Sequence, residues 1–243
     1  MKTYVLSITF SLLILYHSTA AIKNGYGIDI VGARESLRSL KLLLKDNVQL
    51  SVFQRISINT KINDLENFII YFELTETLLE QFKMISPELY FEIDMIKDSS
   101  GTMLDVYVKF VPEKEMVAGV AGTTNLAQEE KDQNAYSSEY GVRTVSVKIA
   151  IVNNALSLLA HEFGHVKYQV PNLATYCKFH SKYYLENGYK GKSMGHNDND
   201  PSGQHAREYG KRFREKSLAY QRQNKTKLNS NLVLLQVIKN KLN

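Results

Sequence analysis

Cysteine is almost absent from this chain of 243 residues, because Cys177 is the only one. A single cysteine cannot form an intrachain disulfide framework, and it cannot supply the thiolates of a cysteine-based zinc cluster. A fold held together by disulfides is therefore excluded. Any bound metal ion must be held by histidine, aspartate or glutamate side chains.

Long apolar runs and dense runs of one charge are also lacking. Beyond the N-terminus the longest apolar run, residues 232–238, is interrupted by Gln236 and is shorter than the ~20 residues that span a bilayer. The net charge is +5 with a pI near 9.0, but Phe213 interrupts the longest basic stretch, residues 211–214. Nucleic-acid binding normally uses a denser basic patch on a recognisable motif. We therefore expect no nucleic-acid partner and no stable membrane insertion of the mature chain.

The N-terminus has the pattern of a secretory signal. Lys2 precedes an apolar stretch over residues 4–16, and small residues follow at 18–20, where a signal peptidase requires them. A membrane anchor is the alternative, but the apolar run is too short to span a bilayer. We expect residues 1–20 to be a signal peptide and residues 21–243 to form a single domain. The protein should be exported, and a secreted and a periplasmic destination are both compatible with this signal.

The remaining composition, 44% hydrophobic and 23% charged, is typical of a globular protein. Apolar residues at helical spacing predict helices over residues 33–45 and 75–85, whereas residues 49–72 mix two periods and are not assigned. Alternating runs over residues 89–96 and 103–111, joined by a turn with glycine, predict a β-hairpin. Further predicted elements are a polar loop over 119–141, a strand over 143–151, and helices over 155–166, 172–186, 201–221 and 232–242.

The informative motif is HExxH, formed by His161, Glu162 and His165 on the helix that follows the strand over 143–151. Residues at positions i and i+4 share a helix face, so both imidazoles can bind one Zn²⁺. Glu162 lies beside them, within reach of a water on the metal. The motif is expected by chance in about one per cent of such sequences, so its surroundings have to support it.

The residues around the motif favour a metal site. The alternative is that both histidines are core residues whose ring nitrogens form hydrogen bonds within the protein. Apolar residues on both sides predict a buried helix, and buried histidines need partners, which a metal ion would provide. Gly164 lies in mid-helix, where it costs about 1 kcal/mol relative to alanine. Close approach of another backbone would explain it. The flanking apolar residues are Leu156, Leu158, Leu159, Ala160, Phe163 and Val166.

With a strand, an HExxH helix and a downstream ligand region, the chain resembles the zincin superfamily of zinc metallopeptidases over about 60 residues. The resemblance implies an α+β fold with a mixed sheet, an active-site helix carrying the motif and a mostly helical C-terminal part. It also implies that an edge strand binds an extended peptide antiparallel, here the strand before the helix or a neighbour of it. The chain is not a metzincin, because Tyr168 and Pro171 replace the glycine and histidine that continue that motif.

A third metal ligand has to come from outside the motif. We favour His196, in a glycine-containing polar segment, because a neutral imidazole suits zinc and glycine permits close approach. A nearby aspartate could orient that imidazole, although Asp200 is equally well placed to cap the next helix. His180 and His205 are expected on the surface. The other candidate ligands are Asp198, Asp200, Glu186 and Glu208.

These observations lead to a zinc-dependent metallopeptidase that is exported and acts on a peptide or protein. One Zn²⁺ per chain would be held by His161, His165 and His196, and Glu162 would take the proton of the zinc-bound water. The alternative is a secreted, non-catalytic binding protein on a zincin-like scaffold, with a structural zinc or none. A zinc hydrolase acting on a non-peptide amide also fits these residues, since the motif fixes water activation and not the substrate.

Overall fold

The computed structural model describes residues 22–27, 29–47, 49–98, 100–127, 144–172, 200–224, 233–235 and 237–238. Its elements are, in chain order, β1 (Ile22–Asn24), α2 (Ile30–Asp46), α3 (Val52–Ile85), α4 (Pro87–Asp94), β2 (Asp105–Val111), the 3₁₀ turn η1 (Glu113–Glu115), β3 (Gly122–Ala127), β4 (Thr144–Ala150), α5 (Ala155–Gln169) and α7 (Pro201–Asn224).

The strands form one four-stranded mixed sheet in the order β1-β2-β4-β3. β1 pairs parallel with β2, and β2 pairs parallel with β4 over the whole of its length. β3 runs antiparallel to β4, with Thr124 opposite Val147. Within the described part of the chain β3 is therefore an edge strand, and β4 lies inside the sheet next to it.

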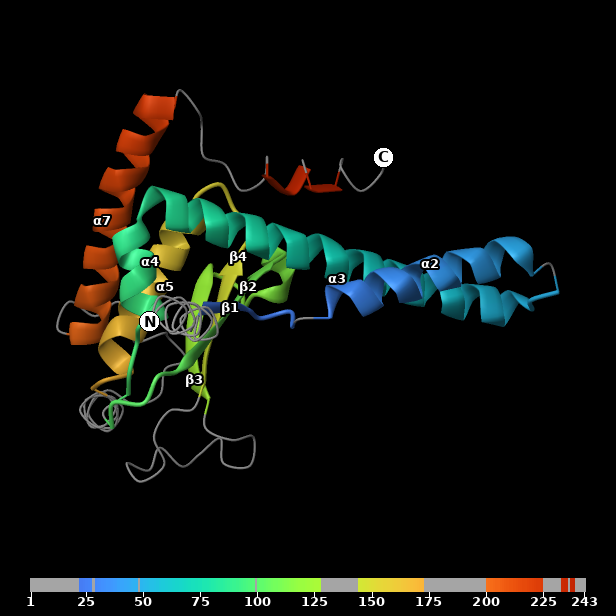
Figure 1. Cartoon of the computed structure of the whole chain (residues 1–243), viewed down its shortest axis with the longest axis horizontal. Coiled ribbons are helices and arrows are strands. Elements are labelled where there is room, and N and C mark those ends of the chain that lie inside the picture. The colour runs from blue at the N-terminus through green and yellow to red at the C-terminus, as the bar shows by residue number, and fades with distance from the viewer. Residues whose placement is uncertain are drawn as a thin grey trace, which may run out of the picture.

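One face of the sheet is apolar and covered by helices (Figure 1). Side chains alternate along a strand, and in β2 and β4 every second residue is a buried Val, Ile or Phe, whereas the residues between them are polar or partly exposed. Helices α3, α5 and α7 meet over this face, where the ring of Phe82 lies 5.3 Å from that of Phe163 and 4.6 Å from that of Phe213. This two-layer arrangement is the α+β fold that the sequence predicts.

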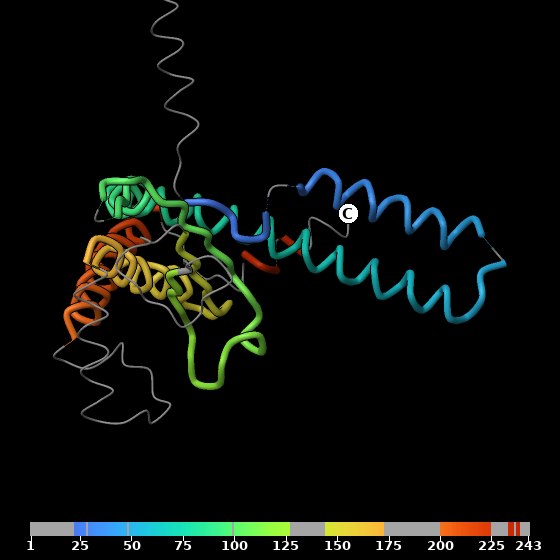
Figure 2. The backbone as a smooth tube through the Cα atoms, turned by 90° about the horizontal axis from the view of Figure 1, so that it is seen from below, coloured from blue at the N-terminus to red at the C-terminus, as the bar shows by residue number. Residues whose placement is uncertain are grey.

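Helix α2 and the first half of α3 form an arm that extends away from the sheet (Figure 2). The two helices bury a small cluster of their own, centred on Leu37, Ile62 and Ile69. A capping box between Ser51 and Gln54 starts α3 just after the turn. The arm is anchored because the second half of α3 continues into the main core through buried residues such as Leu74, Leu78 and Phe82.

The predicted β-hairpin is wrong in its first half. Residues 89–96 form most of helix α4, which Pro87 opens at its first position. The alternating pattern there also contains an i, i+4 pair, Leu89 and Ile93, and both are fully buried. A strand would bury Phe91 as well, but 58% of its surface is exposed. The second half of the hairpin is confirmed as β2.

Most other predicted elements agree with the structure. The predicted helix over 33–45 corresponds to α2, and the predicted strand over 143–151 corresponds to β4. The predicted helix over 75–85 is the end of α3. That long helix begins at Val52 and so also contains most of the unassigned residues 49–72. The predicted polar loop over 119–141 contains a strand, β3, at its beginning. No helix in the described ranges is both long and apolar enough to cross a bilayer. The predicted signal peptide and the helix over 172–186 lie outside the described residues.

Candidate metal centre

Helix α5 carries the HExxH motif along the apolar face of the sheet. It follows β4 directly, and Leu159 and Phe163, both fully buried, fix it against the core. This leaves His161 and His165 one turn apart on the helix. Their ring centroids are 5.0 Å apart and the ring planes meet at 81°, so the two imidazoles are directed at a common region.

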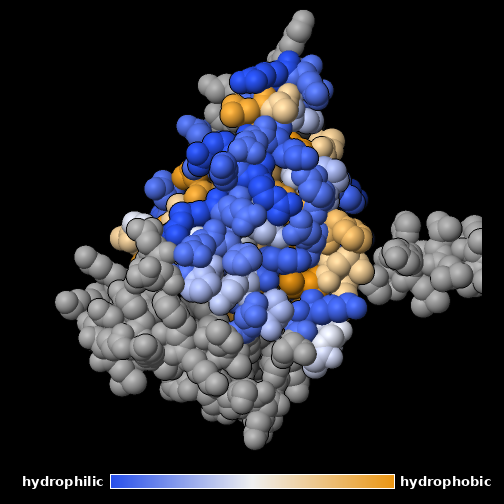
Figure 3. Space-filling view, turned by 90° about the vertical axis from the view of Figure 1, so that its left-hand side faces the viewer, coloured by the Kyte–Doolittle hydropathy of each residue, from blue (hydrophilic) through white to orange (hydrophobic). Residues whose placement is uncertain are grey.

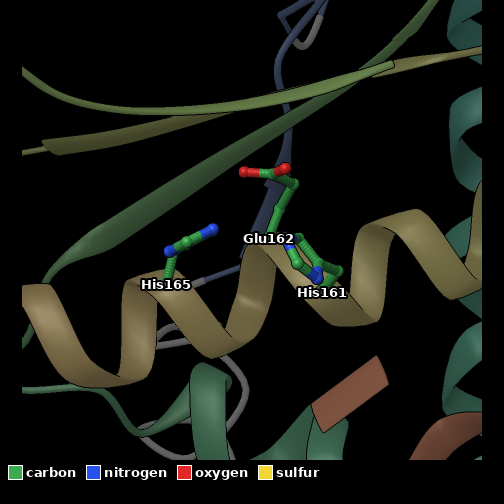
Figure 4. A group of neighbouring side chains, drawn as sticks. All are labelled: His161, Glu162 and His165. Atoms are coloured by element: carbon green, nitrogen blue, oxygen red, sulfur yellow. The ribbon is translucent and has the colours of Figure 1, made fainter. Parts of the chain in front are cut away.

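His161, Glu162 and His165 together form a group that could hold a metal ion (Figure 4). One ligand atom from each of the three lies within 4.8 Å of the other two. Glu162 is 6% exposed and His165 is 7% exposed, and the Nε2 atom of His161 is also buried. Imidazole nitrogen and carboxylate oxygen are ordinary zinc ligands, so the donor set fits that metal.

A hydrogen bond orients His165. Its Nδ1 lies 2.8 Å from the hydroxyl oxygen of Ser202, at the start of α7, and that oxygen also accepts a hydrogen bond of 2.9 Å from the Nε2 amide of Gln169. Since Nδ1 bonds to Ser202, Nε2 is the ring nitrogen through which His165 would bind a metal. Sequence reasoning missed Ser202, and no local pattern marks it, because 37 residues separate it from His165.

Asp200 directly precedes α7 and holds Ser202 in place. Its two carboxylate oxygens accept hydrogen bonds from the backbone N–H groups of Ser202 and Gly203, at 3.0 and 3.2 Å. These contacts are those of a helix N-cap, as the sequence suggested. Asp200 therefore supports the centre through Ser202, and it does not belong to the metal-capable group.

Glu162 points from α5 toward strand β3. The hydroxyl of Thr124 donates a hydrogen bond of 2.7 Å to its Oε2 atom. Gly122 admits the other oxygen, because a Cβ at that position would lie 2.6 Å from Oε1. Burial raises the pKa of Glu162 to about 7 against the opposing effect of the Thr124 hydrogen bond. A carboxyl with such a pKa can both accept and release a proton near neutrality.

Gly164 permits α7 to lie directly on α5. A Cβ on Gly164 would be 2.5 Å from the Cα atom of Ala206 and 2.6 Å from the carbonyl oxygen of His205, both backbone atoms that cannot move aside easily. The close approach expected from a mid-helix glycine is therefore confirmed. It is also what brings Ser202 within hydrogen-bonding distance of His165.

His161 and Glu162 face a cleft of about 610 Å³ between α5, α7 and the chain before β3. Among the residues that the structure describes, Glu162 is the only acidic one that lines it. The other lining residues are Gly119, Val120, Ala121, Gly122, Asn154, Ser157, Leu158, His161, Arg207, Gly210, Lys211 and Arg214. A cleft next to a buried, metal-capable group is the usual location of a reaction centre.

The structure describes only some of the candidate ligands outside the motif. His196, Asp198 and Glu186 lie outside the described residues, so the third ligand stays a prediction. Glu208 is exposed on α7 and does not line the cleft. The ring centroid of His205 lies 5.2 Å from that of Tyr168, and His205 does not belong to the metal-capable group.

No family model, no curated protein and no solved structure matches this chain. The site is therefore defined by its own geometry: a buried His-Glu-His group that could bind a metal ion. This group lies on a helix that packs against a mixed sheet.

Proposed function

We propose that this chain is an exported, zinc-dependent metallopeptidase. The observation that supports it best is the buried group of His161, Glu162 and His165 beside an open cleft. His161 and His165 would hold the zinc, with His196 as the proposed third ligand. A bound zinc would polarise the scissile carbonyl and lower the pKa of a water molecule.

Glu162 is the proposed general base. Its Oε2 atom accepts the hydrogen bond from Thr124, so Oε1 is the oxygen that would take the proton of the attacking water. The same atom would then return the proton to the amine nitrogen that leaves. Burial and the Thr124 contact hold this carboxyl in one orientation, which spares the reorganisation that a solvated side chain would require.

Strand β3 is the proposed peptide-binding edge. The sequence left two possibilities open, the strand before the motif helix and its neighbour. β4, the strand before the helix, is paired on both sides, whereas β3 has β4 on one side only among the described residues. Thr124 and Gly122 of β3 also contact Glu162, so a peptide added antiparallel to β3 would pass next to the general base.

A catalytic role is favoured over binding alone by the position of Glu162. A structural zinc site is closed by its protein ligands, whereas a catalytic site keeps one position open, and Glu162 lines an open cleft. The proposal therefore depends on that carboxyl, which can be changed without removing either histidine.

The test compares wild type with E162Q and with E215Q, a matched change at an exposed carboxyl of α7. All three are loaded with zinc and incubated with a mixed peptide library, and cleavage is followed by mass spectrometry. E162Q should keep its zinc and lose activity by about 10²- to 10⁴-fold, because the water then lacks a base. E215Q should match the wild type. Equal cleavage by E162Q and wild type would refute the proposal.

A further inference from the structure

Three cations line the same cleft as His161 and Glu162. Arg207, Lys211 and Arg214 are spaced at i, i+4 and i+7 on α7, so they form one stripe along that helix. All three are exposed. Figure 3 views the side of the molecule on which α7 lies, and that side is mainly hydrophilic.

The cations on another side of α7 are neutralised, in contrast to Lys211 and Arg214. Arg212 donates to Glu92 of α4 at 2.9 Å, and Lys216 pairs with Glu88 of α4 at 2.8 Å. No ion pair in the described part of the chain involves Lys211 or Arg214, and no acidic residue except the buried Glu162 lines the cleft. Lys211 and Arg214 therefore give the cleft wall a positive charge that no acidic residue of the described ranges pairs with.

We propose that the cleft selects peptides with acidic side chains close to the scissile bond, and that Lys211 and Arg214, together with Arg207, bind those side chains. This inference rests on the proposed peptidase function. The stripe extends about 10 Å along the helix, which corresponds to about three residues of an extended peptide. Alternate side chains of a strand point the same way, so a Glu-x-Glu segment would present both carboxylates to the stripe.

The test measures binding without cleavage. Zinc-loaded E162Q protein is titrated into fluorescein-labelled peptides that differ only in a central Glu-x-Glu, Gln-x-Gln or Lys-x-Lys, and fluorescence anisotropy gives each Kd. The Glu-x-Glu peptide should bind about tenfold more tightly than the Lys-x-Lys peptide at low salt. The difference should shrink on going from about 20 mM to about 500 mM NaCl.

K211Q and R214Q, each added to E162Q, should weaken binding of the Glu-x-Glu peptide by about two- to fivefold and leave the Gln-x-Gln peptide unchanged. R222Q is the matched control, since Arg222 is an exposed cation of the same helix that does not line the cleft. It should leave both affinities unchanged. A loss of the same size in R222Q would overturn the assignment of the stripe.

The remaining outcomes separate the inference from the function on which it rests. Equal Kd values for the three peptides, with equal cleavage of all three by wild type, would overturn the acidic preference and leave the peptidase intact. Preferential binding of Glu-x-Glu with no cleavage by wild type would support the preference and overturn the peptidase. Tighter binding of a labelled oligonucleotide of equal charge, lost in K211Q/R214Q, would overturn the assignment to a peptide.

Discussion

Glu162 is a buried residue whose ionisation the fold controls. Burial raises its pKa to about 7, compared with 4.5 for an unperturbed glutamate. A raised folded-state pKa means that the neutral carboxyl stabilises the fold. This stability is fully present below the unfolded-state pKa, and it is lost as the pH rises through the folded-state value.

The metal-free protein should therefore become less stable relative to E162Q as the pH rises. Between about pH 4.5 and about pH 7 the free energy of unfolding of wild type should fall by about 2–3 kcal/mol more than that of E162Q. Urea denaturation of chelator-treated protein at several pH values measures this difference. E215Q should follow the wild type, and parallel curves for wild type and E162Q would show that Glu162 is not buried as described.

Ser202 is the second residue with a specific expected effect. Its hydroxyl is the partner of the Nδ1 atom of His165, so S202A should free the ring and weaken zinc binding by about 10- to 100-fold. Competition with a chromophoric chelator measures the affinity. S217A is the control, because Ser217 is also largely buried on α7 but donates to the carbonyl of Arg214. Equal zinc affinities of S202A and S217A would show that Ser202 does not orient His165 for metal binding.

The contact between α5 and α7 makes opposite predictions for two glycines. Helix propensity alone says that alanine stabilises a mid-helix position by about 1 kcal/mol. At Gly164 the added methyl group would meet the backbone of α7, so G164A should instead destabilise the protein by about 2 kcal/mol. At Gly210 the nearest atoms are 3.8 and 4.0 Å from the added Cβ, which is ordinary van der Waals contact. G210A should therefore leave the free energy of unfolding unchanged or raise it.

Thermal and chemical unfolding of the two variants decides this point. A loss of stability at Gly164 with none at Gly210 confirms that the helices approach as described. If G164A were as stable as G210A, the two helices would have to lie farther apart, and Ser202 would not reach His165.

The elements that the sequence predicts well are those with one buried face or a clear end signal. In β4 buried residues alternate with more exposed ones, and α5 is buried along most of its length. Asp200 with Pro201 marks the start of α7. The motif residues on α5 follow from spacing alone, because a helix places i and i+4 together whatever surrounds it.

The elements that the sequence predicts badly are those whose pattern fits two structures. In α4 the apolar residues alternate, and only the tertiary packing decides that Leu89 and Ile93 are buried while Phe91 is not. The first half of α3 lies in the arm, where Ile62 and Ile69 pack against α2. Apolar residues that stay exposed, such as Phe53 and Ile56, obscure the helical period of that face in the sequence. β3 contains small and polar residues because it is an edge strand beside the cleft.

The whole molecule assembles the centre from segments that are far apart in the chain. Thr124 comes from β3, the motif from α5 and Ser202 from α7, and the contacts join residues 37 and 38 positions apart. A single sequence shows what each residue could do, but it does not show which of them meet. The three motif residues could be predicted for this reason, whereas their hydrogen-bond partners could not.

Zinc content shows whether His161 and His165 form a metal centre. The mature protein is purified under zinc-replete conditions, and elemental analysis is run on wild type, H161A and H196A, with H205A as a control histidine outside the metal-capable group. Wild type and H205A should hold about one zinc per chain, and H161A should hold none. H196A should also lose zinc, because His196 is the proposed third ligand. Retention of zinc by H196A would transfer that role to Asp198 or Glu186. A wild-type protein without zinc would contradict the account.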